Sequence, residues 1–501
     1  MKKLILIIMA AFMSFTAFAA EEVHFPLIKI VSTQNGGSNT FITEPVAAHV
    51  KEAQQSWFDF SNADKPDPYY EECEITVDGA TYAGQVKVRG NWTTNYPKKS
   101  LRIKLDKKQN ILGLNNGNKF KNWVLLACYK DSSFLRDAAA FTMFKAMFPS
   151  YYSSDCRLVE VEANGEYLGV YLLAEQQEIK KDRIDLTEPS DEDPNSTNIG
   201  YLIEFDSYYY TEKPEEQFEI DYIGKLEDSE GTKLRNLQAG YTIKSDINDK
   251  AQHDFIADYM NKVWEICYRA AYKKTYYRFN SSYELEKYTP EGANDDAKAQ
   301  NCIAQVLDLE SLANMYIFNE LICDPDLYLT SFFMTVDLGE GKDHRVRFEA
   351  PWDSDSAMGN KRFCANSPDN FNGDIKTSFA GRGQPDVNGS FGEGKRGNPW
   401  MVVFVKSGWF KKLVKEQWKK LDTKKVLAQV NKLIDENSSA SYQAVYELTR
   451  SKWGIAQNGA MDELCEASRK AALSSQAESA AYLKKWISDR FKAVENIIKK
   501  L

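Results

Sequence analysis

The stretch CRLVEVEANGEYLGVYLLAE, residues 156–175, decides how the first part of the chain folds. Two runs of β-forming residues lie on either side of Asn164-Gly165. An Asn-Gly pair between two such runs is the strongest short-range signal for a β-hairpin, because both residues accept the positive φ angles of a type I′ turn. The stretch therefore predicts two antiparallel strands joined by a tight turn.

The sequence before this hairpin is also rich in strand signals. Residues 73–77 and 82–88 alternate between apolar and polar side chains, and Asp78-Gly79 between them predicts a second hairpin. Residues 133–148 have the spacing of a helix and contain neither glycine nor proline. We therefore expect residues 20–176 to form a strand-rich N-terminal lobe that contains one helix.

The sequence after the hairpin changes in character twice. Residues 177–245 are charged and rich in Pro, Tyr and Glu, which indicates a hinge with an insertion. Amphipathic patterns predict a helical C-terminal lobe over residues 246–425 and a helical extension over residues 426–501, with Asp308 and Ser475 as helix N-caps. A strand-rich lobe followed by a helix-rich lobe predicts an α+β protein of two lobes, with a cleft between them.

The composition of the chain excludes some classes of protein. A chain of 501 residues is long enough for two or more packed units. Its net charge of −9 argues against nucleic acid as the main partner, because phosphate binding needs a basic field. The eight cysteines are scattered without a C-x-x-C pair, so no zinc site is expected and their pairing stays open.

The first residues of the chain predict export. Residues 1–19 contain two lysines, an apolar run and the cleavage pattern Ala17-Phe18-Ala19, which together indicate a signal peptide, with a membrane anchor as the alternative. No later stretch reaches the ~18 apolar residues that span a bilayer. We therefore expect a protein of the periplasm, cell surface or extracellular space, without a membrane span after cleavage.

Two acidic pairs are candidates for chemistry. Asp353 and Asp355 in the stretch APWDSDSAMGN, residues 350–360, can direct two carboxylates at one hard cation such as Mg²⁺ or Mn²⁺, although a solvated turn is the alternative. Asp324 and Asp326 follow a predicted helix, where an aspartate can act as a general base or orient a hydroxyl group. Protein kinases arrange a catalytic loop and a metal loop in this order.

Basic residues in the N-terminal part are candidates for phosphate binding. Lys98 and Lys99 lead into the alternating strand LRIKL, residues 101–105, although paired lysines also occur on solvated strand edges. There is no G-x-G-x-x-G motif after a strand. The glycine-rich residues 381–398 lack the Walker spacing, which favours a surface loop over a phosphate-binding loop.

Several stretches, taken in order, resemble the CotH kinase family, the spore-coat-protein-H-like group of atypical kinases. They are VRGNW (residues 88–92), PKKSLRIKL (97–105), KNWVLLACYKDSSFLRD (121–137), ANGEYLGVYLLAEQ (163–176), GYLIEFD (200–206) and APWDSDSAMG (350–359). The resemblance covers residues 26–425. It implies an atypical protein-kinase-like fold of two lobes that binds ATP with a divalent metal and phosphorylates serine-bearing secreted or coat proteins.

The resemblance also implies roles for individual residues. Asp326 corresponds to the catalytic-loop aspartate, and Asp353 corresponds to the metal ligand, with Asp355 as its helper. Lys98 or Lys99 is expected to face the phosphates.

Three further residues follow from the same resemblance. Glu175, at the end of a strand, is expected to order the site or approach the nucleotide. Arg136, at the start of the first helix, is either structural or on the phosphate side. Kinases place a metal-binding Asn five residues after the catalytic Asp, but here that position is Ser331.

These observations lead to three hypotheses for the function. The leading one is ATP-dependent transfer of phosphate to Ser or Thr of an exported protein, with transfer of another group, such as an adenylyl or glutamyl group, still open. The second is a surface or matrix binding protein that uses the same fold without catalysis. The third is a glycoside hydrolase with two carboxylates across a groove.

Overall fold

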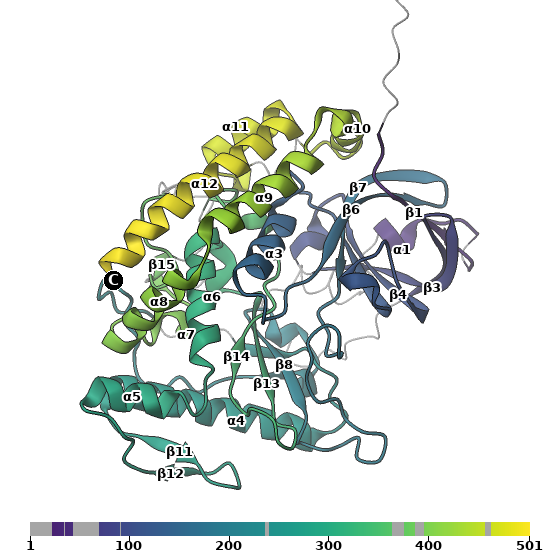
Figure 1. Cartoon of the computed structure of the whole chain (residues 1–501). Helices are drawn as coiled ribbons and strands as arrows, with labels where there is room; N and C mark the ends of the chain where they lie inside the picture. Colours follow the sequence, from purple (N-terminus) through teal and green to yellow (C-terminus); the bar gives the residue numbers. More distant parts are fainter. Residues whose placement is uncertain are drawn as a thin grey trace, which may run out of the picture.

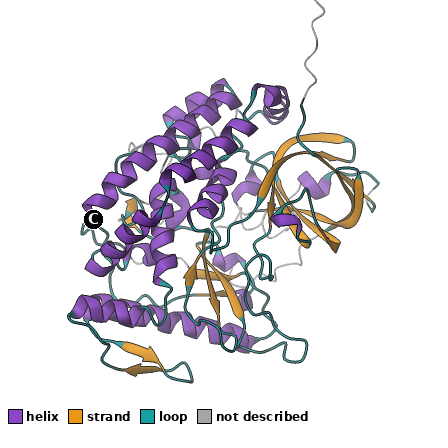
Figure 2. Cartoon of the chain, in the orientation of Figure 1, coloured by secondary structure: helices purple, strands orange, loops and turns teal. Residues whose placement is uncertain are grey.

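The computed structural model describes residues 23–34, 36–43, 70–90, 92–235, 240–362, 375–385, 395–455 and 462–501. The signal-peptide prediction, Cys364 and half of the glycine-rich segment lie outside these residues. The chain has a mixed α/β architecture, in which a barrel of strands lies beside a second sheet and a group of long helices (Figures 1 and 2). Among the described helices, none is long and apolar enough to cross a membrane.

The N-terminal strands close into a seven-stranded barrel. Its order is β1 (Leu27–Ser32), β2 (Glu71–Val77), β3 (Ala80–Arg89), β4 (Ser100–Gln109), β5 (Phe120–Leu126), β7 (Glu166–Glu175) and β6 (Cys156–Ala163). Both hairpins predicted from the sequence are confirmed, since β2 pairs with β3 and β6 pairs with β7 in antiparallel register. The alternating residues of β3 and β4, among them Val86 and Leu101, fill the barrel interior.

Long-range contacts close the barrel and cover it. Strand β1 pairs with β6 in parallel register, so that Ile28 lies opposite Val161. Phe25 stacks on Tyr442 with the ring centres 4.0 Å apart. The backbone N–H of Val170 donates to Thr449 Oγ1 at 3.0 Å, from the helix α10 (Gln443–Trp453). The adjacent Gly169 is required, because a Cβ there would lie 2.5 Å from Thr449 Oγ1.

A second sheet of five strands joins segments that are distant in sequence. Its order is β14 (Arg347–Phe348), β13 (Phe332–Asp337), β8 (Gly200–Asp206), β10 (Gly240–Ile243) and β9 (Gln217–Phe218). Strand β8 is the stretch GYLIEFD quoted above, and it pairs with β13. The sequence patterns did not reveal that they pair, because β8 and β13 are separated by more than a hundred residues.

The remaining described elements are mostly helices. They are α1 (Thr40–Thr43), α3 (Arg136–Met147), α4 (Lys250–Tyr268), α5 (Asp295–Ile303), α6 (Leu309–Ile322), α7 (Pro399–Val402), α8 (Gly408–Lys420), α9 (Thr423–Asn437), α11 (Glu466–Ser474) and α12 (Gln476–Lys500), with the hairpins β11–β12 (Tyr277–Phe279 and Leu285–Lys287) and β15–β16 (Gln384–Pro385 and Lys395–Arg396). The predicted N-caps are confirmed, since Asp308 caps α6 and Ser475 caps α12.

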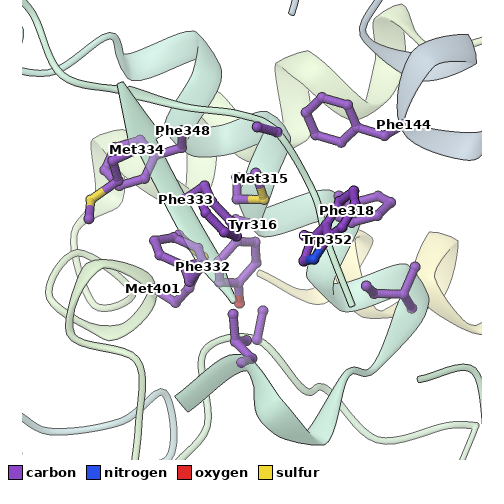
Figure 3. Packing of buried hydrophobic residues seen from close by; sticks show 14 of the residues in the cluster. Phe144, Met315, Tyr316, Phe318, Phe332, Phe333, Met334, Phe348, Trp352 and Met401 are labelled. Atoms are coloured by element: carbon purple, nitrogen blue, oxygen red, sulfur yellow. The ribbon is translucent and has the colours of Figure 1, made fainter. Parts of the chain in front are cut away.

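Helix α6 is the centre of the main hydrophobic core. Its side chains are buried on all faces, as expected for a helix enclosed by other elements. Figure 3 shows Met315, Tyr316 and Phe318 of this helix among aromatic residues of β13, with Trp352 and Phe144 close by. The packing fixes the end of α6, from which the loop with Asp324 and Asp326 begins.

A buried ion pair ties α12 to the end of α6. Arg490 Nη2 lies 3.0 Å from Glu320 Oε2, and neither side chain is exposed. The same guanidinium donates from Nε to the Glu320 carbonyl at 2.7 Å and from Nη1 to the carbonyls of Ile375 and Thr377. Glu320 also accepts from the backbone N–H groups of Phe379 and Ala380.

We expect Arg490→Met to lower the free energy of unfolding by about 3–5 kcal/mol, because it leaves the Glu320 carboxylate buried without its cation. The denaturation midpoint of the purified chain measures this loss. Lys492→Met, on the exposed side of the same helix, is the matched control and should leave the midpoint unchanged. An equal midpoint for Arg490→Met and the unmodified chain would show that the ion pair between Arg490 and Glu320 does not stabilise the fold.

Candidate active site

Two acidic loops come together beside α6. Asp324 and Asp326 lie in a short 3₁₀ turn, Pro325–Tyr328, that follows α6 directly. Asp324 caps this turn, since its side chain accepts from the backbone N–H of Asp326 at 3.0 Å. Asp353 precedes a second 3₁₀ turn, Ser354–Ser356, and has a left-handed backbone conformation with φ of 57°. Such a conformation is uncommon for aspartate and fixes the direction of its side chain.

The Asp353 carboxylate is available to a ligand. Within the described part of the chain, no hydrogen bond or ion pair reaches it. Burial raises its pKa, and the negative charges of Asp326 and Glu204 act in the same direction. The positive charges of Lys130 and Arg89 oppose this rise. A partly buried carboxylate near other carboxylates is stabilised by an added cation.

Lys130 connects the barrel with both acidic loops. It follows β5, and its Nζ lies 2.9 Å from Asp355 Oδ1. Burial lowers the pKa of Lys130, but Asp355, with smaller contributions from Asp326 and Asp353, outweighs burial and holds the pKa well above its usual range. Burial in turn raises the pKa of Asp355 to about 7, against the effect of Lys130. Lys130 is therefore a counter-charge that the two acidic loops share, and the sequence patterns did not single it out.

Asp326 is held in its ionised form. Burial alone would raise its pKa, but Lys361 and Lys130 reverse this effect, and a hydrogen bond from Ser356 adds to it. Lys361 Nζ lies 3.6 Å from Asp326 Oδ1. The pKa of Asp326 is therefore below its ordinary value, whereas burial and the nearby Asp326 raise that of Asp324 well above it.

Residues at the start of helix α3 hold the backbone of the second acidic loop through hydrogen bonds. Arg136 Nε donates to the carbonyl of Ala357 at 3.1 Å, and its guanidinium also forms a buried ion pair with Asp131. Asp137 Oδ1 accepts from the backbone N–H of Ser354 at 2.6 Å. These contacts give Arg136 a structural position under the loop, which is one of the two roles expected from the sequence.

The two lysines expected at the phosphates are engaged elsewhere. Lys98 is buried and donates from Nζ to the backbone carbonyls of Ala127, at 2.7 Å, and Val170, with Nζ 4.0 Å from the centre of the Tyr171 ring. Burial lowers its pKa to about 7. Lys99 Nζ donates to the carbonyl of Thr94 at 2.7 Å. Neither forms an ion pair with Asp326, Asp353 or Asp355 in the described structure.

Glu175 also lies in a network of its own. Its Oε1 is 3.0 Å from Arg183 Nε, and its Oε2 accepts from the backbone N–H of Asp155 at 2.8 Å. The guanidinium of Arg183 stacks 3.8 Å from the centre of the Phe120 ring. The structure thus brings together Asp326, Asp353 and Asp355, and leaves Glu175 in a separate buried ion pair.

A pocket opens beside the acidic loops. It holds about 350 Å³ of empty space, part of it open to solvent. The end of α6, the start of β13 and both loops line it, with Asp324, Ser331, Trp352 and Ser354 among the lining residues. Ser331, where kinases place an asparagine, has a left-handed conformation and donates its backbone N–H to Glu204 Oε1 at 2.9 Å.

The donor set of this region fits a hard divalent cation bound together with phosphates. Among the described residues, no three His, Cys, Asp or Glu side chains gather closely enough to hold a metal by themselves. Mg²⁺ in phosphate-transfer sites is typically held by one or two carboxylates, with phosphate oxygens and water completing the shell. Asp353, together with a carboxylate of the first acidic loop, meets that requirement.

A comparison with protein families gives a match over most of the chain. The family described as CotH kinase protein matches residues 86–494, which is most of the chain and includes both acidic loops and Lys130. No curated protein matches the sequence.

Proposed function

Because this chain belongs to the CotH kinase family, we propose that it transfers the γ-phosphate of ATP to a serine or threonine hydroxyl of an exported protein, with Mg²⁺ or Mn²⁺ as cofactor. The observation that supports this proposal most is the meeting of Asp326, Asp353 and Lys130. Phosphoryl transfer requires three kinds of group: one that orients the acceptor hydroxyl, one that binds the metal, and a fixed positive charge.

Each of these residues has a defined role in the proposal. Asp353 holds the metal, which neutralises charge on the phosphates when it is bound. Asp326 accepts a hydrogen bond from the acceptor hydroxyl and orients its oxygen toward the γ-phosphorus. Lys130 lowers the pKa of both aspartates, together with Lys361 at Asp326, and Arg136 holds the loop that carries Asp353.

The phosphoryl-transfer step needs no reactant besides ATP and the acceptor hydroxyl. The acceptor oxygen forms a bond to the γ-phosphorus, and the bond from that phosphorus to the bridging oxygen of ADP breaks. The hydroxyl proton passes to Asp326 and from there to solvent. The low pKa of Asp326 makes it a weak base, which suits a loose transition state in which the proton leaves late.

We also propose that the barrel and the helical part correspond to the two lobes of a kinase-like fold. The support is that Arg89 ends a barrel strand and Lys130 follows another, whereas Asp326 and Asp353 belong to loops after α6 and after β14. The signal-peptide pattern at residues 1–19 supports export as part of the same proposal.

Transfer of labelled phosphate tests the function directly. The purified chain is incubated with γ-labelled ATP, Mg²⁺ or Mn²⁺, and a serine-rich acceptor protein, and thermal denaturation is followed with and without ATP and metal. We expect label on serine or threonine and a stabilisation that grows with the nucleotide concentration. Absence of both label and stabilisation with either metal would refute the proposal.

We expect Lys130→Gln to move the acidic limb of the pH profile of kcat/KM to higher pH by about one unit. Lys130 lowers the pKa of Asp326, so its removal raises that pKa, and ionised Asp326 is then lost at a higher pH. The matched control is Lys262→Gln, which removes a lysine paired with Asp258 and Glu284 on the surface of α4. An acidic limb that stays in place would contradict the role given to Lys130.

A further inference from the structure

Arg89 and Arg102 lie side by side on the outer face of the barrel, next to the candidate site. In the register of β3 and β4, Arg89 lies opposite Ser100 and Arg102 lies opposite Lys87. The two arginines are therefore diagonal neighbours on one face, and long side chains reach each other across such a pair. The residues that alternate with them, Val88 and Leu101, point into the barrel.

These two guanidinium groups lie near carboxylates but are not paired directly with any of them in the described structure. Neither forms a hydrogen bond or an ion pair with another described residue, and Arg102 Nε is buried without an acceptor. Burial lowers the pKa of Arg89, the charge of Asp353 opposes this effect, and the charge of Arg102 lowers the pKa further. Two neighbouring, partly buried charges of the same sign are unfavourable unless an anion lies between them.

The pair lies next to the loop that carries the proposed metal ligand. The Arg89 guanidinium is 5.5 Å from the centre of the Trp352 ring, and Trp352 directly precedes Asp353. Among the opposite charges that act on the pKa of Arg89, Asp353 has the largest effect, ahead of Glu204 and Asp137. An anion held by the two arginines would therefore adjoin a cation held by Asp353.

We propose that Arg89 and Arg102 bind the polyphosphate chain of the nucleotide. A guanidinium donates two parallel hydrogen bonds to phosphate oxygens, and two guanidinium groups side by side match two consecutive phosphates. This inference rests on the proposed function, and it gives to arginines the phosphate contact that the family resemblance implied for Lys98 or Lys99. Arg102 belongs to the same LRIKL strand.

Binding of tripolyphosphate without metal tests the site separately from catalysis. Calorimetry or thermal denaturation compares the unmodified chain with Arg89→Gln, Arg102→Gln and the double variant. We expect each single variant to bind tripolyphosphate about tenfold or more weakly, because each loses charge-assisted hydrogen bonds. Lys104→Gln is the matched control, since Lys104 is two residues further along the same face of β4 and should change binding little.

Kinetics with ATP provide the second measurement. The arginine variants should raise the KM for ATP more than they lower kcat, because the contact is made in the ground state as well as in the transition state. Arg89→Lys with Arg102→Lys keeps both charges without the paired donors, and it should fall between the unmodified chain and the double Gln variant. It serves as the test if the Gln variants fail to fold.

The outcomes separate the site from the function. Tripolyphosphate binding that is lost in the arginine variants, in a chain that transfers no phosphate, supports the site and refutes the proposed function. Phosphate transfer with an unchanged KM for ATP and unchanged tripolyphosphate binding in the arginine variants supports the function and overturns the site. Equal losses in Lys104→Gln would also overturn it, because they would indicate only general attraction to a basic face.

Discussion

Asp326→Asn should lower kcat by about 10²–10⁴-fold, the contribution of a positioned acid–base group. Asparagine keeps the shape of the side chain, but it accepts the hydroxyl proton poorly and no longer attracts Lys361. The backbone of the turn should persist, because Asp324 still accepts from the N–H of residue 326. Steady-state kinetics with a saturating acceptor measures the loss.

The Asp326 variant has two internal checks. Stabilisation by ATP with Mg²⁺ should stay close to that of the unmodified chain, because the proposal places the metal on Asp353. Asp343→Asn, at a surface ion pair with Arg345, is the matched control and should keep full activity. An Asp326→Asn variant that retains more than a tenth of kcat would remove this residue from the chemical step.

Asp353→Asn should abolish the metal-dependent part of nucleotide binding and lower activity by at least about 10²-fold. In the unmodified chain, ATP at a hundred times its dissociation constant should add about 2.7 kcal/mol of stability. The variant should show little of this gain when Mg²⁺ is added. A titration of ATP at fixed Mg²⁺ and Mn²⁺, followed by thermal denaturation, measures both proteins.

The pattern across the two variants is more informative than either result alone. Asp326→Asn should bind ATP and metal but fail to transfer phosphate, whereas Asp353→Asn should fail at both. The stability of Asp353→Asn without ligand should not fall, since no described residue bonds its carboxylate and burial raises its pKa. Equal stabilisation of Asp353→Asn and the unmodified chain by ATP with Mg²⁺ would show that the metal is held elsewhere.

Local signals in the sequence were sufficient for several elements of the fold. The Asn164-Gly165 and Asp78-Gly79 turns fix their hairpins within a few residues, and Asp308 and Ser475 cap their helices through contacts three residues away. The closure of the barrel depends instead on pairing between β1 and β6. Nothing in the pattern of either strand specifies a partner more than a hundred residues away.

The site was predictable in part for the same reason. The two acidic loops stand out as motifs, and the structure brings Asp326, Asp353 and Asp355 together around Lys130. The basic partners were harder to identify, because the sequence around a lysine does not indicate which groups its ammonium group contacts in the fold. Lys98 lies on backbone carbonyls inside the protein, whereas Lys130, three residues before the predicted helix at 133–148, reaches Asp355.

The contacts that close and cover the barrel also determine when it can fold during synthesis. A hydrogen bond joins Phe25 to Glu160, which lies 135 residues later in the chain. Another joins Val170 to Thr449, which lies 279 residues later. At ribosomal rates of about 5–20 residues per second, Thr449 emerges tens of seconds or less after Val170. The barrel can close through the pairing of β1 with β6 once Glu175 is made, but the face of β7 that α10 covers stays exposed from then until Thr449 is synthesised. We therefore expect the chain to depend on chaperones before its last helices are made, and a chain that ends before α10 to aggregate.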